Sequence, residues 1–326
     1  MTSRRVLLAA LAVVATGYAA HALPQPTVTR IAYFANGLTP TDGMLPATLR
    51  QALRELGYVE GRNVVYISRW ADLKSERLPV IARELAEMKP DVVIAFGYPP
   101  ALAMKAATTT IPIVVTAVGD PVATGLVASF ARPGANLTGI SDQSAELSGK
   151  RLELLKEVRP DASRIAVLWN AGNEAMTQRY REIERAAGAL HITVDALAVR
   201  DPADFDAAFA AMRRAKPDAL LVVTDALTNS NQARVLDFAA NSSVPAMYES
   251  GPIVRNGGLI SYGPRPDDML RRVAVYVDHI IKGAKPSDLP IEQSTQFELL
   301  INMKTAKSLG VAIPNSVFMR ADEVIQ

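Results

Sequence analysis

The stretch Ile111–Asp142, IPIVVTAVGDPVATGLVASFARPGANLTGISD, organises the rest of the chain. It opens with the apolar, β-branched run 111–118, which predicts a strand buried on both faces of a parallel sheet. The turn-forming residues Gly119, Asp120 and Pro121 end this strand. Ligands bind at the carboxyl ends of strands in α/β sheets, so Gly119 and Asp120 are candidate binding residues.

The remainder of this stretch leads out of one lobe of the protein. Residues Val122–Ala131 predict a short helix, and Pro133-Gly134 predicts a turn. Residues 136–140 form a second extended piece that ends at Ser141-Asp142. We therefore expect the chain to pass from a first lobe into a second lobe directly after this stretch.

These motifs resemble those of a known family. DPVATGLV (120–127) and RPGANLTGIS (132–141) are similar to motifs of the bacterial ABC-transporter substrate-binding family that includes the tryptophan-binding protein TrpX. Ala135 stands where family members commonly have a second glycine. The likeness extends to KPDVVIAFG (89–97) and GGLISYG (257–263), and it covers essentially the whole chain after the leader. The resemblance implies a type I periplasmic binding protein fold.

Residues 1–22 have the pattern of a cleaved secretory signal peptide. Arg4 and Arg5 form a basic start, an apolar run follows, and Ala20-His21-Ala22 is a cleavage site of the small-x-small type. The apolar run of about 15 residues is shorter than the roughly 20 needed to span a bilayer. The chain has no cysteine, which excludes a lipoprotein anchor and disulfides. We expect a freely soluble periplasmic protein that is not a lipoprotein.

The composition of the remaining chain fits two ordinary domains. About 304 residues remain after the leader, which is enough for two hydrophobic cores. Removing Arg4 and Arg5 leaves 33 basic residues against 33 acidic ones. A net charge of zero gives no electrostatic case for nucleic acid or for an anionic membrane surface as a partner.

The chain after the leader repeats itself. Three landmarks recur in the same order with offsets of 134, 127 and 133 residues. The pairs are 30–37 with 164–171, 89–96 with 216–223, and Ile111-Pro112 with Val244-Pro245. Such self-similarity predicts two lobes of similar structure.

Each copy alternates strands and helices, which predicts a parallel, doubly wound sheet in each lobe. The expected helices are 45–56, 73–88, 99–108, 144–158, 174–190, 202–215, 228–240, 267–282 and 304–309. The expected strands include 92–96, 165–169, 193–198, 219–224, 245–248, 258–262 and 297–302. The fold class is therefore α/β, with two similar lobes joined by a hinge of three crossings.

The resemblance to type I periplasmic binding proteins places these crossings near residues 141–143, 261–265 and 290–296. Lobe I would comprise residues 23–142 plus about 263–293. Lobe II would comprise residues 143–262 plus about 294–326. We expect a ligand cleft between the two lobes.

Enzyme signatures are absent from the sequence. After the leader the chain has two histidines, His191 and His279, about 90 residues apart, and no cysteine with which they could form a zinc site or a nucleophile–base pair. No nucleophile elbow, dinucleotide fingerprint or phosphate loop occurs. We expect no enzyme activity, no metal and no cofactor.

Candidate ligand-binding residues stand at the carboxyl ends of the predicted strands, where they would line a common cleft with aromatic rings, carboxylates and amides. In the first lobe these are Phe34, Ala35, Asn36, Gly97, Tyr98, Pro99, Gly119 and Asp120. In the second they are Asn170 with the adjacent Trp169, Thr224, Asp225, Tyr248 and Glu249, and Tyr262 lies on a crossing. Helix or turn capping is the alternative role for Asp120 and Asp225.

The resemblance also implies a division of labour for an amino-acid ligand. The loop after KPDVVIAFG would hold the ligand carboxylate by backbone N–H groups. Asp225 would accept the ammonium. Relatives often read GTPA at 97–100, whereas this chain reads GYPP, which adds a ring at Tyr98 and removes a donor at Pro100. This departure favours a flat aromatic or weakly acidic ligand held by stacking.

The sequence therefore predicts the periplasmic solute-binding component of an ABC uptake transporter. It would close two lobes over a small organic ligand, either an amino acid or an aromatic or weakly acidic compound, and act as a monomer with an inner-membrane permease. A ligand-sensing subunit for a receptor kinase is the main alternative, and an exported enzyme is a more distant one. A repressor of the same architecture would need an N-terminal helix-turn-helix in place of the leader.

Overall fold

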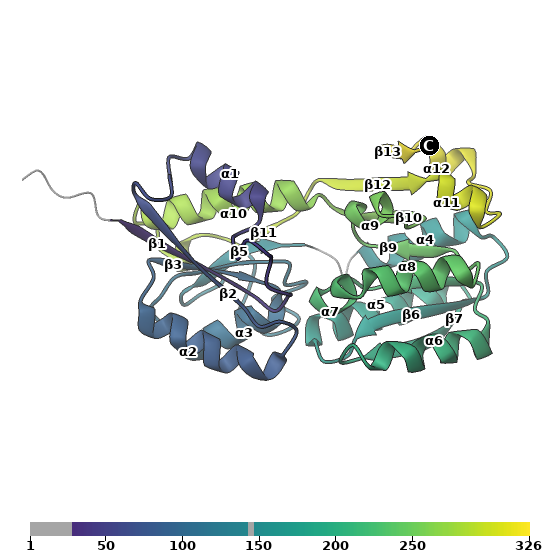
Figure 1. Ribbon diagram of the computed structural model, residues 1–326, viewed down its shortest axis with the longest axis horizontal. Helices are drawn as coiled ribbons and strands as arrows, with labels where there is room; N and C mark the ends of the chain where they lie inside the picture. Colours follow the sequence, from purple (N-terminus) through teal and green to yellow (C-terminus); the bar gives the residue numbers. More distant parts are fainter. Residues whose placement is uncertain (1–27, 143–146) are drawn as a thin grey trace, which may run out of the picture.

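The computed structural model describes residues 28–142 and 147–326. The expected signal peptide and the start of the expected helix 144–158 lie outside these residues. Two lobes lie side by side along the long axis of the molecule (Figure 1). Each is built around its own sheet.

The first lobe holds a six-stranded parallel sheet in the order β11-β5-β4-β3-β1-β2. Helices α1 (Ala47–Glu55) and α10 (Pro266–Ile281) cover one face, and α2 (Leu78–Met88) and α3 (Tyr98–Ala107) cover the other (Figure 1). The strands are β1 (Thr29–Ala35), β2 (Val64–Trp70), β3 (Val92–Phe96), β4 (Ile113–Thr116), β5 (Leu137–Ser141) and β11 (Glu292–Gln293). The short turns η1 (Ser75–Arg77) and η2 (Pro286–Asp288) precede α2 and β11.

The second lobe holds a seven-stranded sheet in the order β13-β12-β10-β9-β8-β6-β7. Its strands are β6 (Arg164–Asn170), β7 (Thr193–Val199), β8 (Ala219–Val222), β9 (Ala246–Tyr248), β10 (Ile260–Pro264), β12 (Phe297–Asn302) and β13 (Glu323–Ile325). Its helices are α4 (Leu147–Val158), α5 (Glu174–Ala189), α6 (Asp204–Ala215), α7 (Ala226–Ser230), α8 (Gln232–Asn241), α9 (Gly251–Arg255), α11 (Met303–Ser308) and α12 (Asn315–Phe318). Strand β12 pairs antiparallel with β10, so the parallel pattern is interrupted at this edge.

The two sheets repeat one topology, as the internal repeat predicts. The order β2-β1-β3-β4-β5 of the first lobe matches β7-β6-β8-β9-β10 of the second. The chain passes between the sheets three times, after β5, after β10 and after β11. The predicted fold class of two doubly wound lobes with a three-crossing hinge is confirmed.

The repeated Lys-Pro-Asp motif performs the same structural task in both lobes. Lys89 and Lys216 end α2 and α6 in the left-handed conformation. Asp91 then accepts a hydrogen bond from the backbone N–H of Arg30, with 2.7 Å between the atoms. Asp218 accepts from the backbone N–H of Arg164 at 2.9 Å. Each aspartate therefore fixes the start of the neighbouring first strand of its lobe.

Three local expectations differ from the structure. The expected helix Val122–Ala131 is a series of turns, because the Asp120 carboxylate accepts the N–H groups of Val122 and Ala123 and Gly125 adopts a φ of +70°. The expected helix 228–240 is two helices that meet at Asn231. Strand β2 was not predicted; it lies at the sheet edge, and most of its residues are half-buried. Among the described residues, none of the helices is long and apolar enough to cross a bilayer.

The backbone conformation and close packing of Gly139 allow a prediction about the stability of the protein. It lies in β5 with a φ of +145°, and an added Cβ would lie 2.1 Å from the carbonyl oxygen of Val115 in the neighbouring strand. We expect Gly139→Ala to lower the free energy of unfolding by about 3 kcal/mol or more, because β4 and β5 must separate. Urea unfolding measures the change.

Gly188 is the matched control. It lies in α5, and a Cβ there would meet nothing within 4 Å. Gly188→Ala should raise stability by about 0.5–1 kcal/mol, as expected for an unstrained helix position. Equal stability of Gly139→Ala and the parent protein would contradict the expected steric conflict.

Candidate functional site

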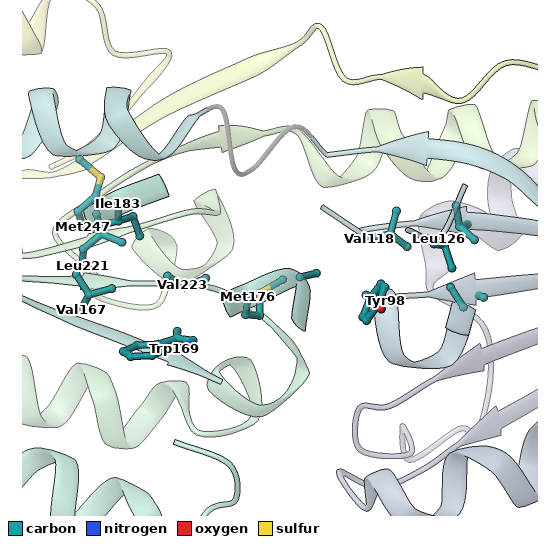
Figure 2. Close-up of a cluster of buried hydrophobic side chains, with 14 of the residues drawn as sticks. Tyr98, Val118, Leu126, Val167, Trp169, Met176, Ile183, Leu221, Val223 and Met247 are labelled. Carbon is teal, nitrogen blue, oxygen red and sulfur yellow. The ribbon is translucent and has the colours of Figure 1, made fainter. Parts of the chain in front are cut away.

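The two lobes touch along the edges where their strands end. A Cβ added at Gly119 in the first lobe would lie 3.5 Å from the Cβ of Ala175 and 3.6 Å from Nη2 of Arg179, both in α5 of the second lobe. One apolar cluster of buried side chains continues from the first lobe into the second. Figure 2 shows Tyr98 on one side of this junction and Met176 on the other. The strand ends of both lobes therefore face a shared region.

The loop after β3 begins α3 but has little capacity to bind an anion. Gly97 is the N-cap residue of α3, with a φ of +92°, and its N–H donates to the carbonyl of Thr116 at 2.8 Å. Pro99 and Pro100 have no N–H to donate. Tyr98 is buried, and burial together with the negative charge of Glu174 raises the pKa of its hydroxyl. This loop therefore presents the aromatic ring of Tyr98 and few backbone N–H donors.

The other first-lobe candidates divide between core and cleft. Phe34 and Ala35 are fully buried in the two cores on either side of the sheet. Asn36 is 9 % exposed, and its Oδ1 has no hydrogen-bond partner among the described residues. The Gly119 carbonyl accepts from the Ser141 hydroxyl at 2.8 Å, and Asp120 caps the following turn.

Asp225 of the second lobe is an N-cap residue. Its Oδ1 accepts from the N–H groups of Leu227 and Thr228, which completes a capping box at the start of α7. Its Oδ2 accepts from the side-chain amides of Asn170 at 2.7 Å and Asn173 at 3.3 Å. The carboxylate therefore has donors on both oxygens before any ligand binds.

Glu249 lies at the centre of a buried ion cluster. Its Oε1 binds Arg151 at 2.8 Å, and its Oε2 binds Arg179 at 3.0 Å. Oε2 also accepts from the Thr224 N–H at 2.8 Å. Arg179 forms a second ion pair with Asp142, which follows β5. The cluster joins α4, α5 and the ends of β5, β8 and β9.

The two arginines differ in their electrostatics. Burial alone would lower the pKa of Arg179, but the carboxylates of Asp142 and Glu249 together raise it above its ordinary value. Burial lowers the pKa of Arg151, and the charge of Glu249 offsets this only in part. Sequence reasoning missed both residues. The signal for Arg151 was a charged residue at helical spacing from the apolar residues Leu155 and Val158.

The remaining candidates lie at different depths. Tyr248 is buried in the core beneath α8 and α9 and does not line the cleft. Tyr262 is half-buried, and its backbone carbonyl accepts from Arg151 Nε at 2.7 Å. Trp169 is buried and stacks on Tyr180, with 3.8 Å between the ring centroids.

A groove of about 550 Å³ opens where the two lobes meet. It is lined mainly by apolar side chains of α2 and α3, among them Leu78, Pro99 and Leu102, and by Tyr98. The second lobe contributes Gly172 and Glu174 from the start of α5. Of the residues predicted to bind a ligand, Tyr98 and Pro99 therefore line this groove, opposite Gly172 and Glu174 of the second lobe.

Several buried polar atoms near the strand ends have no hydrogen-bond partner among the described residues. They are Asn36 Oδ1, Thr116 Oγ1, Trp169 Nε1 and Thr224 Oγ1. Buried polar groups are normally satisfied, so these atoms mark places where a bound molecule or water would supply partners. The described residues contain no cluster of three or more His, Cys, Asp or Glu side chains that could hold a metal ion.

Comparison with protein families gives a match over residues 42–325 to the model for ABC transporter substrate binding proteins. A tyrosine-binding protein from Clostridioides difficile is 28% identical over 276 residues, which cover 84% of this chain and 79% of that protein.

Two solved structures, one with a ligand and one without, are similar to this chain. An ABC domain from Streptococcus pneumoniae in complex with L-Trp matches with a TM-score of 0.85 at 25% identity, over 92% of this chain and all of that chain. The ligand-free, open structure of an adhesive substrate-binding protein from Clostridium difficile matches with a TM-score of 0.63 at 26% identity and the same coverage. This chain therefore superposes better on the L-Trp complex than on the ligand-free, open structure.

The role of Asp225 as a cap can be tested without any ligand. Asp225→Ala should lower the free energy of unfolding by about 1–2 kcal/mol, because the first turn of α7 loses its acceptor. Asp225→Asn keeps an acceptor oxygen and should cost less. Thermal or urea unfolding of the two variants measures the difference, and equal losses for both would count against capping.

Proposed function

Since this chain belongs to the family of ABC transporter substrate-binding proteins, we propose that it delivers a small aromatic solute to an inner-membrane ABC permease. The family binds solutes between two lobes. The observation that supports an aromatic solute is the GYPP loop, which places the Tyr98 ring at the groove between the lobes and leaves no free N–H at Gly97. Aromatic rings stack well on such a surface.

The ligand class is either an aromatic amino acid or an aromatic acid. The relatives named for tyrosine and L-Trp favour the amino acid. The occupied oxygens of Asp225 favour a ligand that does not depend on this carboxylate. Asn36 Oδ1 and Thr224 Oγ1 would provide hydrogen bonds from opposite lobes to the polar end of either ligand.

The ligand would act by stabilising the closed arrangement of the lobes. A molecule that contacts both lobes binds the closed state more tightly than the open one and so shifts the population towards closure. In this proposal lobe I comprises residues 23–142 plus about 263–293. Lobe II comprises residues 143–262 plus about 294–326.

Residues 1–22 would direct export to the periplasm, where the cleaved protein would act as a monomer. The protein would bind its solute without chemical change. A receptor-kinase sensor would use the same cleft, and co-purification with a permease or with a kinase distinguishes the two partners.

A thermal-shift screen with L-tryptophan, L-tyrosine and benzoate tests the ligand class. A cognate solute at about 100 times its dissociation constant should stabilise the protein by roughly 2.7 kcal/mol. For a chain of this size the melting temperature should rise by about 5 °C or more. No shift with any aromatic solute, together with a shift for a sugar or an aliphatic amino acid, would contradict the aromatic assignment.

Asp225→Asn then tests whether the ligand ammonium is held by this residue. The substitution removes the charge and keeps an oxygen for the α7 cap. If Asp225 binds the ammonium, the affinity for L-tryptophan should fall about tenfold or more, which corresponds to about 1.4 kcal/mol. The affinity for indole-3-propionic acid, which lacks the ammonium, should not change. Calorimetric titration of both solutes measures this, and an unchanged affinity for both removes Asp225 from the binding site.

A further inference from the structure

Arg179 connects the binding edge of the second lobe to the end of the first lobe. Its Nη1 binds Glu249 Oε2 at 3.0 Å and approaches the Thr224 carbonyl at 3.4 Å. Its Nη2 binds Asp142 Oδ2. Glu249 and Thr224 follow strands β9 and β8 of the second sheet, whereas Asp142 follows β5 of the first sheet.

The position of Asp142 makes this ion pair sensitive to the lobe orientation. It is the last described residue before the first passage between the lobes. The third passage lies beside it, since the backbone N–H of Ser294 donates to the carbonyl of Ser141 at 3.0 Å. The same guanidinium packs against Gly119, so Arg179 meets the first lobe at two points.

Burial makes the geometry of the pair important. The side chains of Arg179 and Asp142 are 3 % and 9 % exposed. Opposite charges attract strongly where water is excluded, but each loses its hydration and must find its partner at close range. A rotation of the lobes that displaced Asp142 from Arg179 would leave a buried charge without its partner or expose both to water.

We propose that Arg179 is a positioning residue for lobe closure, and that its ion pair with Asp142 stabilises the closed orientation over the open one. This inference rests on the proposed solute-binding function. Arg179 holds Glu249 and Thr224 at the cleft edge with one side of its guanidinium. It holds the hinge end of the first lobe with the other.

Arg151 provides a matched control in the same cluster. It is fully buried and pairs with Glu249 at 2.8 Å. It also donates to the Tyr262 carbonyl in β10 at 2.7 Å, and both of these contacts lie in the second lobe. Arg151→Lys keeps the positive charge beside Glu249 and Asp142, so it should lower the melting temperature and change the lobe equilibrium less than Asp142→Asn does.

The test uses Asp142→Asn, which keeps the shape of the side chain and removes its charge. The chain contains no cysteine, so Glu84→Cys in α2 and Arg214→Cys in α6, both exposed, allow site-specific dye labelling across the two lobes. Single-molecule FRET then reports the open and closed populations with and without L-tryptophan. Stopped-flow release of L-tryptophan gives the dissociation rate constant.

We expect Asp142→Asn to shift the FRET distribution towards the open state and to raise the dissociation rate constant about tenfold. Asp142→Glu keeps the negative charge that Asp142→Asn removes, so its closed population and its dissociation rate constant should lie nearer to those of the parent protein. Populations and release rates equal to those of the parent protein, with only a lower melting temperature, would overturn the proposal.

The labelled parent protein separates this outcome from a failure of the proposed function. If it neither binds nor closes with L-tryptophan, L-tyrosine or benzoate, the proposed function is wrong. In that case the ligand-free distributions still decide the role of the ion pair. Identical distributions for the parent protein and Asp142→Asn would reject it.

Discussion

The interior of the second lobe depends on a carboxylate that has been removed from water. Glu249 is surrounded by two arginines and a backbone N–H, and these donors compensate for its lost hydration. Apolar residues of the same volume could give similar stability, so the contribution of such a cluster lies in fixing orientations. Here it fixes α4 and α5 relative to the ends of β8 and β9, which are the elements that face the first lobe.

The first lobe offers a contrasting surface. Its edge is formed by Tyr98, two prolines and Gly119, and no ion pair among its described residues lies at this edge except the one through Asp142. An edge with buried ion pairs thus meets an edge with an aromatic ring and two prolines. This asymmetry supports the proposed aromatic solute with a small polar end, because the first-lobe edge offers a ring and the second-lobe edge offers polar groups.

Much of the architecture could be predicted from the sequence, because it depends on patterns that repeat. The Lys-Pro-Asp motif and the offsets between its copies predicted two equivalent lobes, and Asp91 and Asp218 have the same structural role. The turns at 122–131 could not be predicted from helical spacing, because the Asp120 side chain competes for the N–H groups that a helix would use.

The site was less accessible to sequence reasoning. Strand ends placed Tyr98, Pro99, Asn36 and Thr224 near the cleft, but the same rule included Tyr248, which is turned into the core. Arg151 and Arg179 were missed because their partners are distant in sequence, with 98 and 70 residues separating them from Glu249. Local sequence patterns cannot reveal these ion pairs, because they form only when the folded chain brings the end of β9 next to α4 and α5.

The helix α10 has a consequence for the synthesis of the protein. Met269, Val273 and Val277 of this helix complete the core that β1, β3 and β4 present on one face of the first sheet. The strands of that sheet up to β5 leave the ribosome more than a hundred residues before this cover is made. During that interval only α1 covers this apolar sheet face, and the incomplete cover favours aggregation and makes chaperone binding or delayed folding advantageous.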